Sequence, residues 1–243
     1  MSLELIFKPK SLFSMIRIGK NYDGGYLVGK KSLLQSKTLI TFGIKNDWSF
    51  ELDFMRNNNN AKVICFDNQL NFKLLLRLTV QQLIFIFWNR KISLLILHFK
   101  NLFNFFTFKK KATLIKKHIS YGDVASVSKK YDDIFFKIDI DGSEYRLFEE
   151  LIQIKHKILG LVIELHDIDL HKEKIINFIK QLDLELIHIH PNNFAGVDRN
   201  NDPIVVELTF EKNPELCSNE ISFPHKLDMK NNPLNNDIEL KFQ

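Results

Sequence analysis

The sequence predicts a single α/β domain of the Rossmann-like class, with a mostly parallel seven-stranded sheet that ends in an antiparallel hairpin. Short, nearly continuous apolar runs end in Gly or Asp and alternate with helix-like stretches. Such runs suit parallel strands buried on both faces, and the alternation predicts right-handed βαβ units. Two late runs with only a loop between them predict the closing hairpin. The runs are 37–43, 62–67, 133–141, 159–167, 184–193 and 203–210, with a weaker one at 114–120.

One continuous domain is expected over residues 1–243. This length suits a single α/β domain with a sizeable core, and no proline lies between Pro9 and Pro191 to mark a linker. The two cysteines, Cys65 and Cys217, are too few for a disulfide framework or a CxxC metal pattern. A reducing cytoplasm is therefore the expected compartment, and the first residues lack the pattern of a secretion signal.

Apolar spacing predicts the helices of the second half of the domain. Residues 143–157 form one apolar helical face with Ser143 as the expected N-cap, and residues 171–182 repeat the pattern. The turn-rich residues 213–243 predict a C-terminal wrap over the surface, with a short strand at 237–242.

A basic, apolar insert at about residues 70–111 is expected to be helical and to separate strands two and three. No acidic residue occurs between Asp67 and Asp123, whereas ten basic residues do. The longest uncharged run, Leu78 to Asn89, is too short to span a bilayer. The basic residues are Lys73, Arg77, Arg90, Lys91, Lys100, Lys109, Lys110, Lys111, Lys116 and Lys117.

Three interpretations of this insert stay open. Its helices pack on the domain or form a homodimer interface, or they lie on an anionic membrane surface, or they form a lid whose cations hold a phosphate-bearing substrate. Nucleic acid is disfavoured as a partner, because the basic residues alternate with Leu, Ile and Phe.

Candidate cofactor-binding residues follow the first three strands, because ligands of open α/β sheets bind at the carboxyl ends of strands. Gly43 would allow the backbone to approach a ligand. Asp47 or Ser49 would cap the next helix, whose N-terminus favours a carboxylate such as that of methionine. Asp67, 24 positions after Gly43, suits hydrogen bonds to ribose hydroxyls. Asp123 would bind an adenine amino group or, equally well, cap a helix.

Candidate catalytic residues follow strands four to six. Asp139 and Asp141 lie on the same side of strand four, and Glu164 and His166 on the same side of strand five. Like charges held this close need a cation, a hydrogen-bond network or a proton. With His190 on the next strand, these residues form an acid–base group. Alternatively, Asp139, Glu164, His166 and His190 hold a divalent metal. Acid–base chemistry is preferred because no compact ligand motif such as HExxH occurs.

These motifs together resemble the FkbM-type methyltransferase family, in particular its branch with an N-terminal Arg-x-Gly…Asp-Gly-Gly-Tyr element. The resemblance extends from about residue 16 to the end and weakens between Asp67 and about Thr113. Lys45 stands where the family often has a second glycine, and Asp141 replaces its usual Glu. The matching segments are RIGKNYDGGY (17–26), TFGIKNDWSFE (41–51), FFKIDIDGSEY (135–145), LVIELH (161–166) and LIHIHPNNFAG (186–196).

The resemblance implies a class I methyltransferase fold, S-adenosylmethionine as cofactor and O-methylation as the reaction. It adds Asp23, Gly24, Gly25 and Tyr26 to the candidate cofactor-binding residues. The implied acceptor is a small molecule: a sugar, a nucleotide-sugar or a surface-glycan (capsule) precursor.

Two other classes of protein stay open. A nicotinamide-dependent oxidoreductase would need a phosphate loop, and KNDWS (45–49) is a poor one. A non-catalytic membrane-associated scaffold would not need the acidic and histidine cluster. The expected location is the cytoplasm, with peripheral contact to the inner membrane face if the insert binds lipid.

Overall fold

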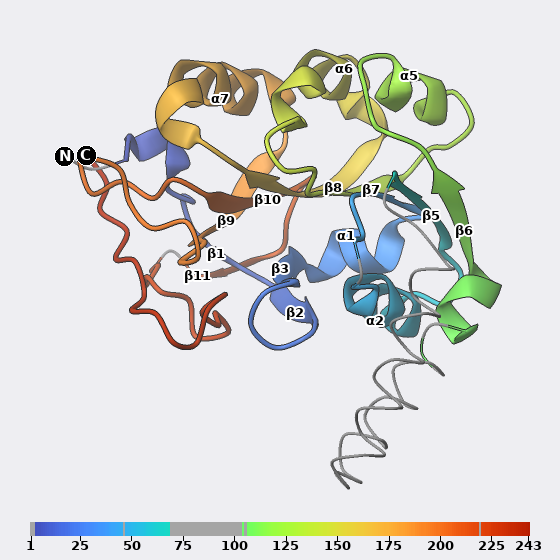
Figure 1. Ribbon diagram of the computed structural model, residues 1–243, viewed down its shortest axis with the longest axis horizontal. Coiled ribbons are helices and arrows are strands. Elements are labelled where there is room, and N and C mark those ends of the chain that lie inside the picture. Colours follow the sequence, from blue (N-terminus) through green and yellow to red (C-terminus); the bar gives the residue numbers. More distant parts are fainter. Residues whose placement is uncertain (1–2, 46, 69–103, 105, 219) are drawn as a thin grey trace, which may run out of the picture.

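The computed structural model describes residues 3–45, 47–68, 104, 106–218 and 220–243. Its centre is a seven-stranded sheet in the order β6-β5-β4-β7-β8-β10-β9 (Figure 1). Strands β4 to β8 are parallel, and β10 is antiparallel to β8 and β9. The predicted Rossmann-like sheet with its closing hairpin is confirmed. The strands are β4 (Thr38–Phe42), β5 (Lys62–Asp67), β6 (Ala112–Lys116), β7 (Ile134–Ile138), β8 (Ile158–Leu165), β9 (Glu185–Pro191) and β10 (Val206–Glu211).

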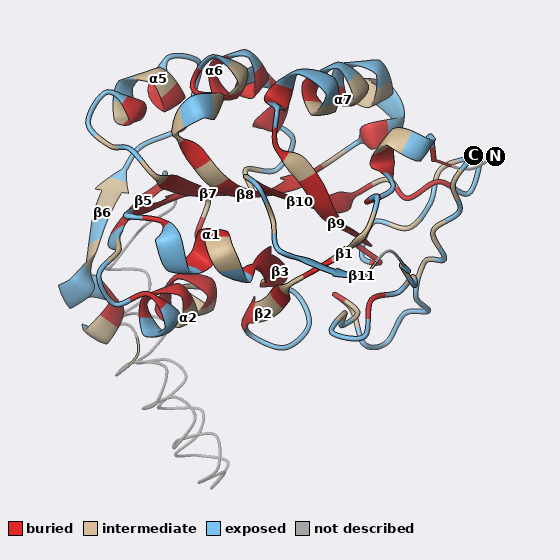
Figure 2. Ribbon diagram, turned by 180° about the vertical axis from the view of Figure 1, so that it is seen from behind, coloured by how far each residue is buried: buried red, intermediate tan, exposed pale blue. Residues whose placement is uncertain are grey.

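Two layers cover the sheet, one on each face (Figure 1). Helices α5 (Asp123–Ser128), α6 (Phe148–Gln153) and α7 (Ile168–Leu182) cover one face. The other carries α1 (Lys30–Gln35), α2 (Ser49–Asn57) and a hairpin of β2 (Met15–Gly19) and β3 (Gly25–Gly29). Strands β4 and β7 are buried along their whole length, as expected of parallel strands between two layers. Figure 2 shows this burial at β7.

Amphipathic spacing orients the long helix α7. Its buried positions, Ile168, Ile175, Phe178 and Leu182, form one stripe against the sheet. The Phe178 ring stacks on Phe148 of α6, with ring centroids 4.0 Å apart. This packing joins the two helices into the layer that supports the carboxyl ends of β7 and β8.

The predicted helix 143–157 is wrong as a continuous element. The chain forms 3-10 turns at Glu144–Arg146 and Lys155–Lys157 on either side of α6. Ser143 makes no side-chain cap bond. Instead, the buried Glu144 carboxylate accepts the N–H groups of Ile140 and Gly142 at 2.9 and 3.2 Å, which holds the chain in a tight turn after β7.

Two predicted strands also differ from the structure. The third strand is β6 and ends at Lys116, before the predicted 120, because the chain turns where Ser120 donates its N–H to Asp123 at 2.9 Å. The predicted strand 237–242 is reduced to a bridge between Phe242 and Leu3, which places the two termini side by side (Figure 1). Short strands β1 (Leu12–Phe13) and β11 (Leu216–Ser218) pair nearby.

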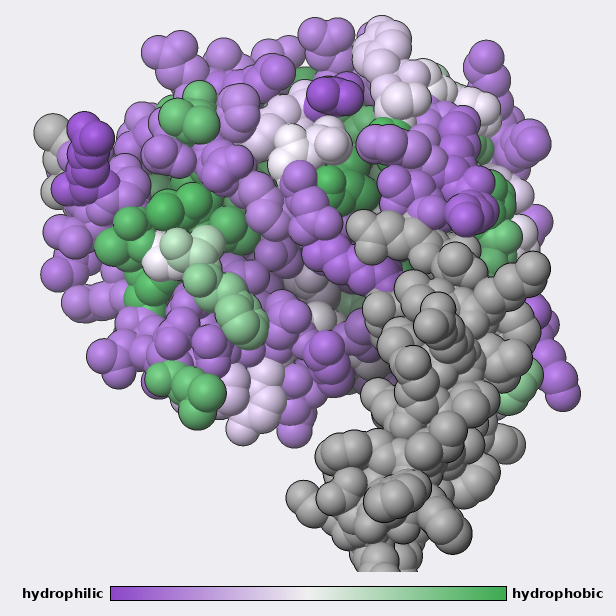
Figure 3. Space-filling view, viewed as in Figure 1, coloured by the Kyte–Doolittle hydropathy of each residue, from purple (hydrophilic) through white to green (hydrophobic). Residues whose placement is uncertain are grey.

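The insert at about 70–111 lies between β5 and β6 and mostly outside the described residues; residues 104 and 106–111 are helical. In the part of the chain that the structure describes, no helix has the length and apolar character needed to cross a bilayer. Hydrophilic residues cover most of the face in Figure 3, and hydrophobic ones gather toward its left side.

Candidate functional site

A pocket of about 260 Å³ opens at the carboxyl edge of the sheet, where β4, β5, β6 and β7 end. Strand β4 is the point at which the strand order reverses, with β5 on one side and β7 on the other. Ligands of open α/β sheets bind in such a position. The described lining residues are Gly43, Lys45, Phe66, Asp67, Asn68, Lys117, His118, Ile119, Asp139, Ile140, Asp141 and Ser143.

Gly43 and Asp67 shape the pocket together. Asp67 accepts the backbone N–H groups of Ile44 and Lys45 on one carboxylate oxygen, at 2.9 and 2.6 Å. Gly43 has φ +83°, and a Cβ there would overlap the carbonyl oxygen of Asp139. Both residues lie in the lining, where the sequence placed them. Asp67 also holds the loop after β4, a task that the sequence analysis did not predict.

Asp47 and Ser49 hold the turn of the β2–β3 hairpin against the start of α2. Asp47 Oδ1 accepts the N–H of Ser49, the first residue of α2, at 3.0 Å, but the N-cap position is Trp48, which makes no side-chain cap bond. Its other oxygen pairs with the Lys20 ammonium at 2.9 Å. Ser49 Oγ accepts the backbone N–H of Lys20 at 3.0 Å. Both side chains therefore bind other parts of the protein rather than facing the pocket.

The Asp-Gly-Gly-Tyr element reaches the site through its tyrosine. Asp23 is exposed in the hairpin turn, and Gly25 begins β3. Gly24 has φ +86°, and a Cβ there would lie 2.5 Å from the carboxylate that accepts the first N–H of α2. The buried Tyr26 hydroxyl donates a hydrogen bond to Glu164 at 3.0 Å. The two glycines thus let the hairpin pack closely, and Tyr26 holds Glu164.

Asp123 contacts its own loop. One carboxylate oxygen pairs with the Lys117 ammonium, and the other accepts the N–H of Ser120 at 2.9 Å. Asp123 is the first residue of α5, after Gly122 in the left-handed conformation. Both oxygens of the Asp123 carboxylate thus already have partners within the protein, which disfavours the expected contact with an adenine amino group. Lys117, its partner, lines the pocket.

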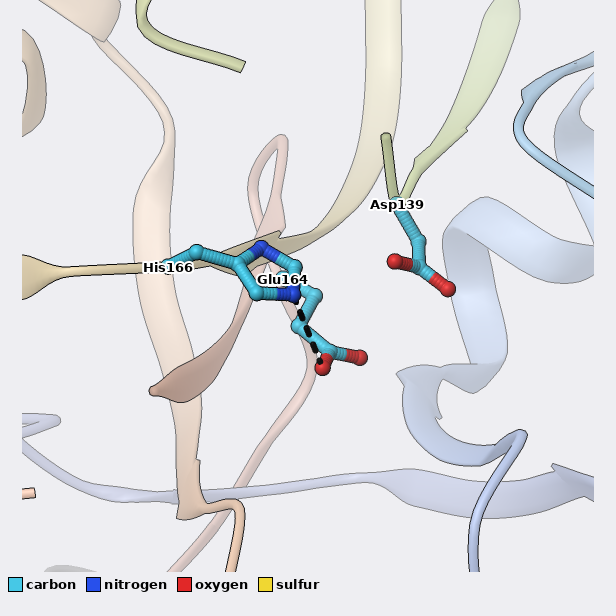
Figure 4. Close-up of side chains that lie close together, drawn as sticks. All are labelled: Asp139, Glu164 and His166. Atoms are coloured by element: carbon cyan, nitrogen blue, oxygen red, sulfur yellow. Dashed lines mark ion pairs between the residues drawn. The ribbon is translucent and has the colours of Figure 1, made fainter. Parts of the chain in front are cut away.

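Asp139, Glu164 and His166 converge beside the pocket (Figure 4). One side-chain N or O atom of each lies within 4.8 Å of the others. His166 Nε2 lies 3.7 Å from Glu164 Oε1 and 4.0 Å from Asp141 Oδ1. Of the five side chains that the sequence analysis grouped, three therefore converge and Asp141 lies beside His166; Asp139 and Asp141 also line the pocket.

Neighbouring groups fix the orientation of His166 and Glu164. His166 Nδ1 faces the fully buried Glu144 carboxylate at 3.2 Å, which leaves Nε2 directed toward Glu164. Glu164 accepts hydrogen bonds from the Tyr26 hydroxyl at 3.0 Å and from Asn192 Nδ2 at 2.9 Å. The sequence analysis assigned no role to Glu144 or Asn192. The signal that could have indicated the role of Asn192 is its position two residues after His190, since such residues alternate to the same side of a strand.

The site carries an excess of negative charge. Burial and the nearby Asp139 and Glu207 carboxylates raise the pKa of Glu164 to about 8. Burial alone would lower the pKa of His166, but the adjacent Glu144 and Glu164 carboxylates raise it to about 9. The neighbouring carboxylates contribute to both shifts, beside the effect of burial on Glu164, so added positive charge would be stabilising.

Two lysines supply positive charge at this edge. Lys45, in the left-handed conformation at φ +51°, places its ammonium 2.8 Å from Asp141 and 3.9 Å from Asp139. The buried Lys137 ammonium donates to the Gly43 carbonyl at 3.1 Å and lies 5.5 Å from the centre of the Tyr26 ring. The sequence analysis missed both roles, although Lys137 lies in β7, two residues before Asp139, which follows the strand.

His190 lies in a second buried network, under the C-terminal tail. Asp228 of the tail is 2.9 Å from His188 Nε2 and 3.7 Å from His190 Nδ1. Asn231 donates to Glu207 at 2.7 Å, and Glu207 pairs with His190 across β10 and β9. The structure thus separates His190 from the three-residue group of Figure 4. The physical reason is a carboxylate of the C-terminal tail. Its position cannot be predicted from the alternation of side chains along a strand.

We expect the contact between His190 and Asp228 of the tail to contribute to the free energy of unfolding in a way that depends on pH. Although burial lowers the pKa of His190, Asp228 and Glu207 raise it to about 8, above the unfolded value of about 6.5. This stability is therefore complete below pH 6.5 and lost as pH rises through about 8. Between pH 6 and 9, the free energy of unfolding of the native chain should fall by up to about 2 kcal/mol more than that of the Asp228→Asn variant.

The measurement is urea unfolding of both proteins at pH 6 and pH 9. Other ionisable side chains of this network are His188, Asp237 and Arg17, and comparing the two proteins largely cancels their contributions. Equal pH dependence in the native chain and the variant would contradict the role of Asp228.

Comparison with known proteins adds fold likeness only. No family model matches the sequence, and no curated protein matches it. The structure is similar to a precorrin-6y C5,15-methyltransferase from Geobacter metallireducens (12% identity, 75% of this chain and 84% of that chain, TM-score 0.41). It is similar to a Methanococcus jannaschii fibrillarin pre-rRNA processing protein (8%, 85% and 84%, 0.41) and to mitomycin 7-O-methyltransferase (8%, 76% and 52%, 0.36). These similarities are too weak to indicate a function.

Proposed function

We propose that the protein transfers a methyl group from S-adenosylmethionine to a hydroxyl of a small, sugar-like acceptor. One observation carries the proposal. Asp139 belongs both to the pocket at the reversal point of the sheet and to the Asp139–Glu164–His166 cluster. A cofactor in the pocket would therefore end beside side chains that can activate a hydroxyl.

The lining of the pocket suits the parts of this cofactor. Asp67 at the end of β5 would accept hydrogen bonds from the ribose hydroxyls, and Phe66 and Ile119 offer apolar contact to the adenine. At the other end, the Asp139 and Asp141 carboxylates favour the positively charged sulfonium and ammonium groups of the cofactor. The charge excess described above is thus matched to a cationic ligand.

The transfer itself needs positioning and loss of a proton. The acceptor oxygen forms a bond to the methyl carbon while the carbon–sulfur bond breaks, leaving its electron pair on sulfur. The hydroxyl proton must leave as the new bond forms. The Asp139–Glu164–His166 cluster would promote this loss, since His166 Nε2 is held toward Glu164 by the contact of Nδ1 with Glu144.

The acceptor class and the surroundings of the enzyme belong to this proposal. The resemblance to FkbM-type enzymes supports a sugar, nucleotide-sugar or capsule precursor. The small number of cysteines supports work in the cytoplasm, and the basic, apolar composition of the insert at about 70–111 supports contact with a membrane surface or with a second copy. Vesicle flotation and sedimentation of the whole chain would separate these two roles of the insert.

Calorimetric titration with S-adenosylmethionine and S-adenosylhomocysteine tests the cofactor. We expect binding of both, and Asp67→Ala should weaken it about tenfold to a hundredfold, as loss of hydrogen bonds to a charged group does. Asp132→Ala is the matched control, because Asp132 is an exposed aspartate that precedes β7 at the opposite edge of the sheet. Binding of NADH instead would indicate the oxidoreductase. Binding of neither, with strong binding to vesicles, would indicate the scaffold.

A further inference from the structure

We propose that Asp139, Glu164 and His166 bind one divalent transition-metal ion, of the type of Mn²⁺, which activates the acceptor hydroxyl. The inference deepens the proposed function and rests on it for the role of the ion. The binding site itself rests on the arrangement of the three side chains and the groups that hold them.

The three side chains present a suitable donor set at suitable distances. One carboxylate oxygen of Asp139, one of Glu164 and a nitrogen of His166 lie within 4.8 Å of one another. Two ligands of one ion lie roughly 3 to 4.2 Å apart when each bond is about 2.1 Å long. His166 Nε2 and Glu164 Oε1 already meet this condition at 3.7 Å. Carboxylate and imidazole ligands together favour a first-row transition ion.

The groups behind the cluster point to a metal site independently. Glu144 faces His166 Nδ1 at 3.2 Å, and this contact leaves Nε2 as the nitrogen that is directed toward Glu164. Tyr26 and Asn192 each donate to one oxygen of Glu164, at 3.0 and 2.9 Å. A carboxylate behind a histidine and donors behind a carboxylate are the usual supports of metal ligands.

Asp139 shows a corresponding need for a cation. Its Oδ1 is buried, and the described part of the chain offers it no hydrogen-bond donor. The Lys45 ammonium lies 3.9 Å from this oxygen, beyond hydrogen-bonding distance, while it bonds Asp141 at 2.8 Å. Lys45 therefore neutralises the cluster only in part. It would compete with the ion, since both are attracted by the same carboxylate.

An ion in this place would act on the acceptor directly. Three protein ligands leave coordination positions that a hydroxyl oxygen can fill, and the ion lowers the pKa of a bound hydroxyl. The proton then passes to water, and the oxygen attacks the methyl carbon as sulfur takes the electrons of the broken bond. His166 Nε2 would serve as a ligand in this arrangement, so another group would receive the proton.

Titration of the metal-free chain with Mn²⁺, followed by electron paramagnetic resonance and calorimetry, tests the site. We expect a single site that Asp139→Asn and His166→Ala each weaken by about tenfold or more. Asp132→Asn and His156→Ala, exposed residues at the opposite edge of the sheet, should change nothing. Tyr26→Phe, which keeps the ring and removes only the donor to Glu164, should weaken binding about tenfold.

Lys45→Gln gives a test of opposite sign. Removing the competing ammonium should strengthen Mn²⁺ binding several-fold, a gain that damage to the fold would not produce. The proposal is overturned if the folded native chain binds no Mn²⁺, or if the Asp139 and His166 variants bind it as the native chain does.

Cofactor titration with and without a chelator keeps the two proposals separate. Binding of S-adenosylmethionine without Mn²⁺ binding would overturn the metal site and leave His166 as a general base. Binding of Mn²⁺ without binding of the cofactor would overturn the proposed function and leave the metal site standing.

Discussion

His166→Ala and Asp139→Asn should each lower the rate of methyl transfer by about a hundredfold to ten-thousandfold while S-adenosylmethionine affinity changes little. This is the range lost when a positioned proton acceptor is removed, and loss of a metal ligand costs at least as much. His166 makes its ionic contacts with Glu144, Glu164 and Asp141 and is not among the described residues that line the pocket. Its removal should thus affect turnover and spare binding.

The measurement is single-turnover transfer to the acceptor, with calorimetry on the same samples. His156→Ala is the control for His166→Ala, and thermal unfolding identifies variants that fail to fold. Asp139 lines the pocket, so Asp139→Asn should weaken the cofactor slightly more than His166→Ala does. Turnover close to that of the native chain in His166→Ala would remove His166 from the mechanism.

Sequence pattern predicted the sheet correctly, and it also predicted that Asp139, Glu164 and His166 would lie close together, because both predictions depend on strand periodicity. Asp139 follows β7, and Glu164 and His166 alternate at the end of the neighbouring β8. Since parallel strands end at the same edge, two short patterns were enough to bring the three side chains together. Gly43 and Asp67 were placed in the pocket by the same reasoning.

Residues whose partners are distant in sequence could not be placed in this way. His190 resembled a site residue until Asp228, 38 positions later, was seen to cover it. Asp47 and Ser49 follow β4 as cofactor-binding residues do, yet the β2–β3 turn takes up both side chains. The local sequence does not indicate which of several carboxylates a loop will contact in the folded protein.

The departure at Lys45 shows a further limit of motifs. A second glycine would have suggested only close backbone approach at this position. The structure instead has a lysine whose backbone N–H bonds Asp67 at 2.6 Å and whose ammonium reaches Asp141 at 2.8 Å. One residue therefore links Asp67 in the pocket to the acidic cluster, and that link depends on the left-handed turn at φ +51°.

Gly43→Ala should destabilise the fold by about 2–6 kcal/mol and abolish cofactor binding. The residue has φ +83°, which costs a side chain roughly 1–3 kcal/mol. The added methyl group would also overlap the Asp139 carbonyl oxygen, and overpacking of this kind costs about another 1–3 kcal/mol. The strand ends would have to separate where the Asp139 N–H bonds the Phe42 carbonyl at 2.9 Å, so the pocket would lose its shape.

Gly196→Ala separates the clash from the backbone strain. Gly196 also has positive φ, +76°, but no described atom lies within 4 Å of a Cβ built there. The Gly196→Ala variant should lose stability only through the backbone strain and should keep its affinity for S-adenosylmethionine. Thermal unfolding should therefore show a fall of roughly 10 °C for Gly43→Ala and a clearly smaller one for Gly196→Ala. Similar falls in both variants, with cofactor binding retained in Gly43→Ala, would mean that β4 and β7 can separate without harm. The pocket would then not depend on the close approach that Gly43 allows.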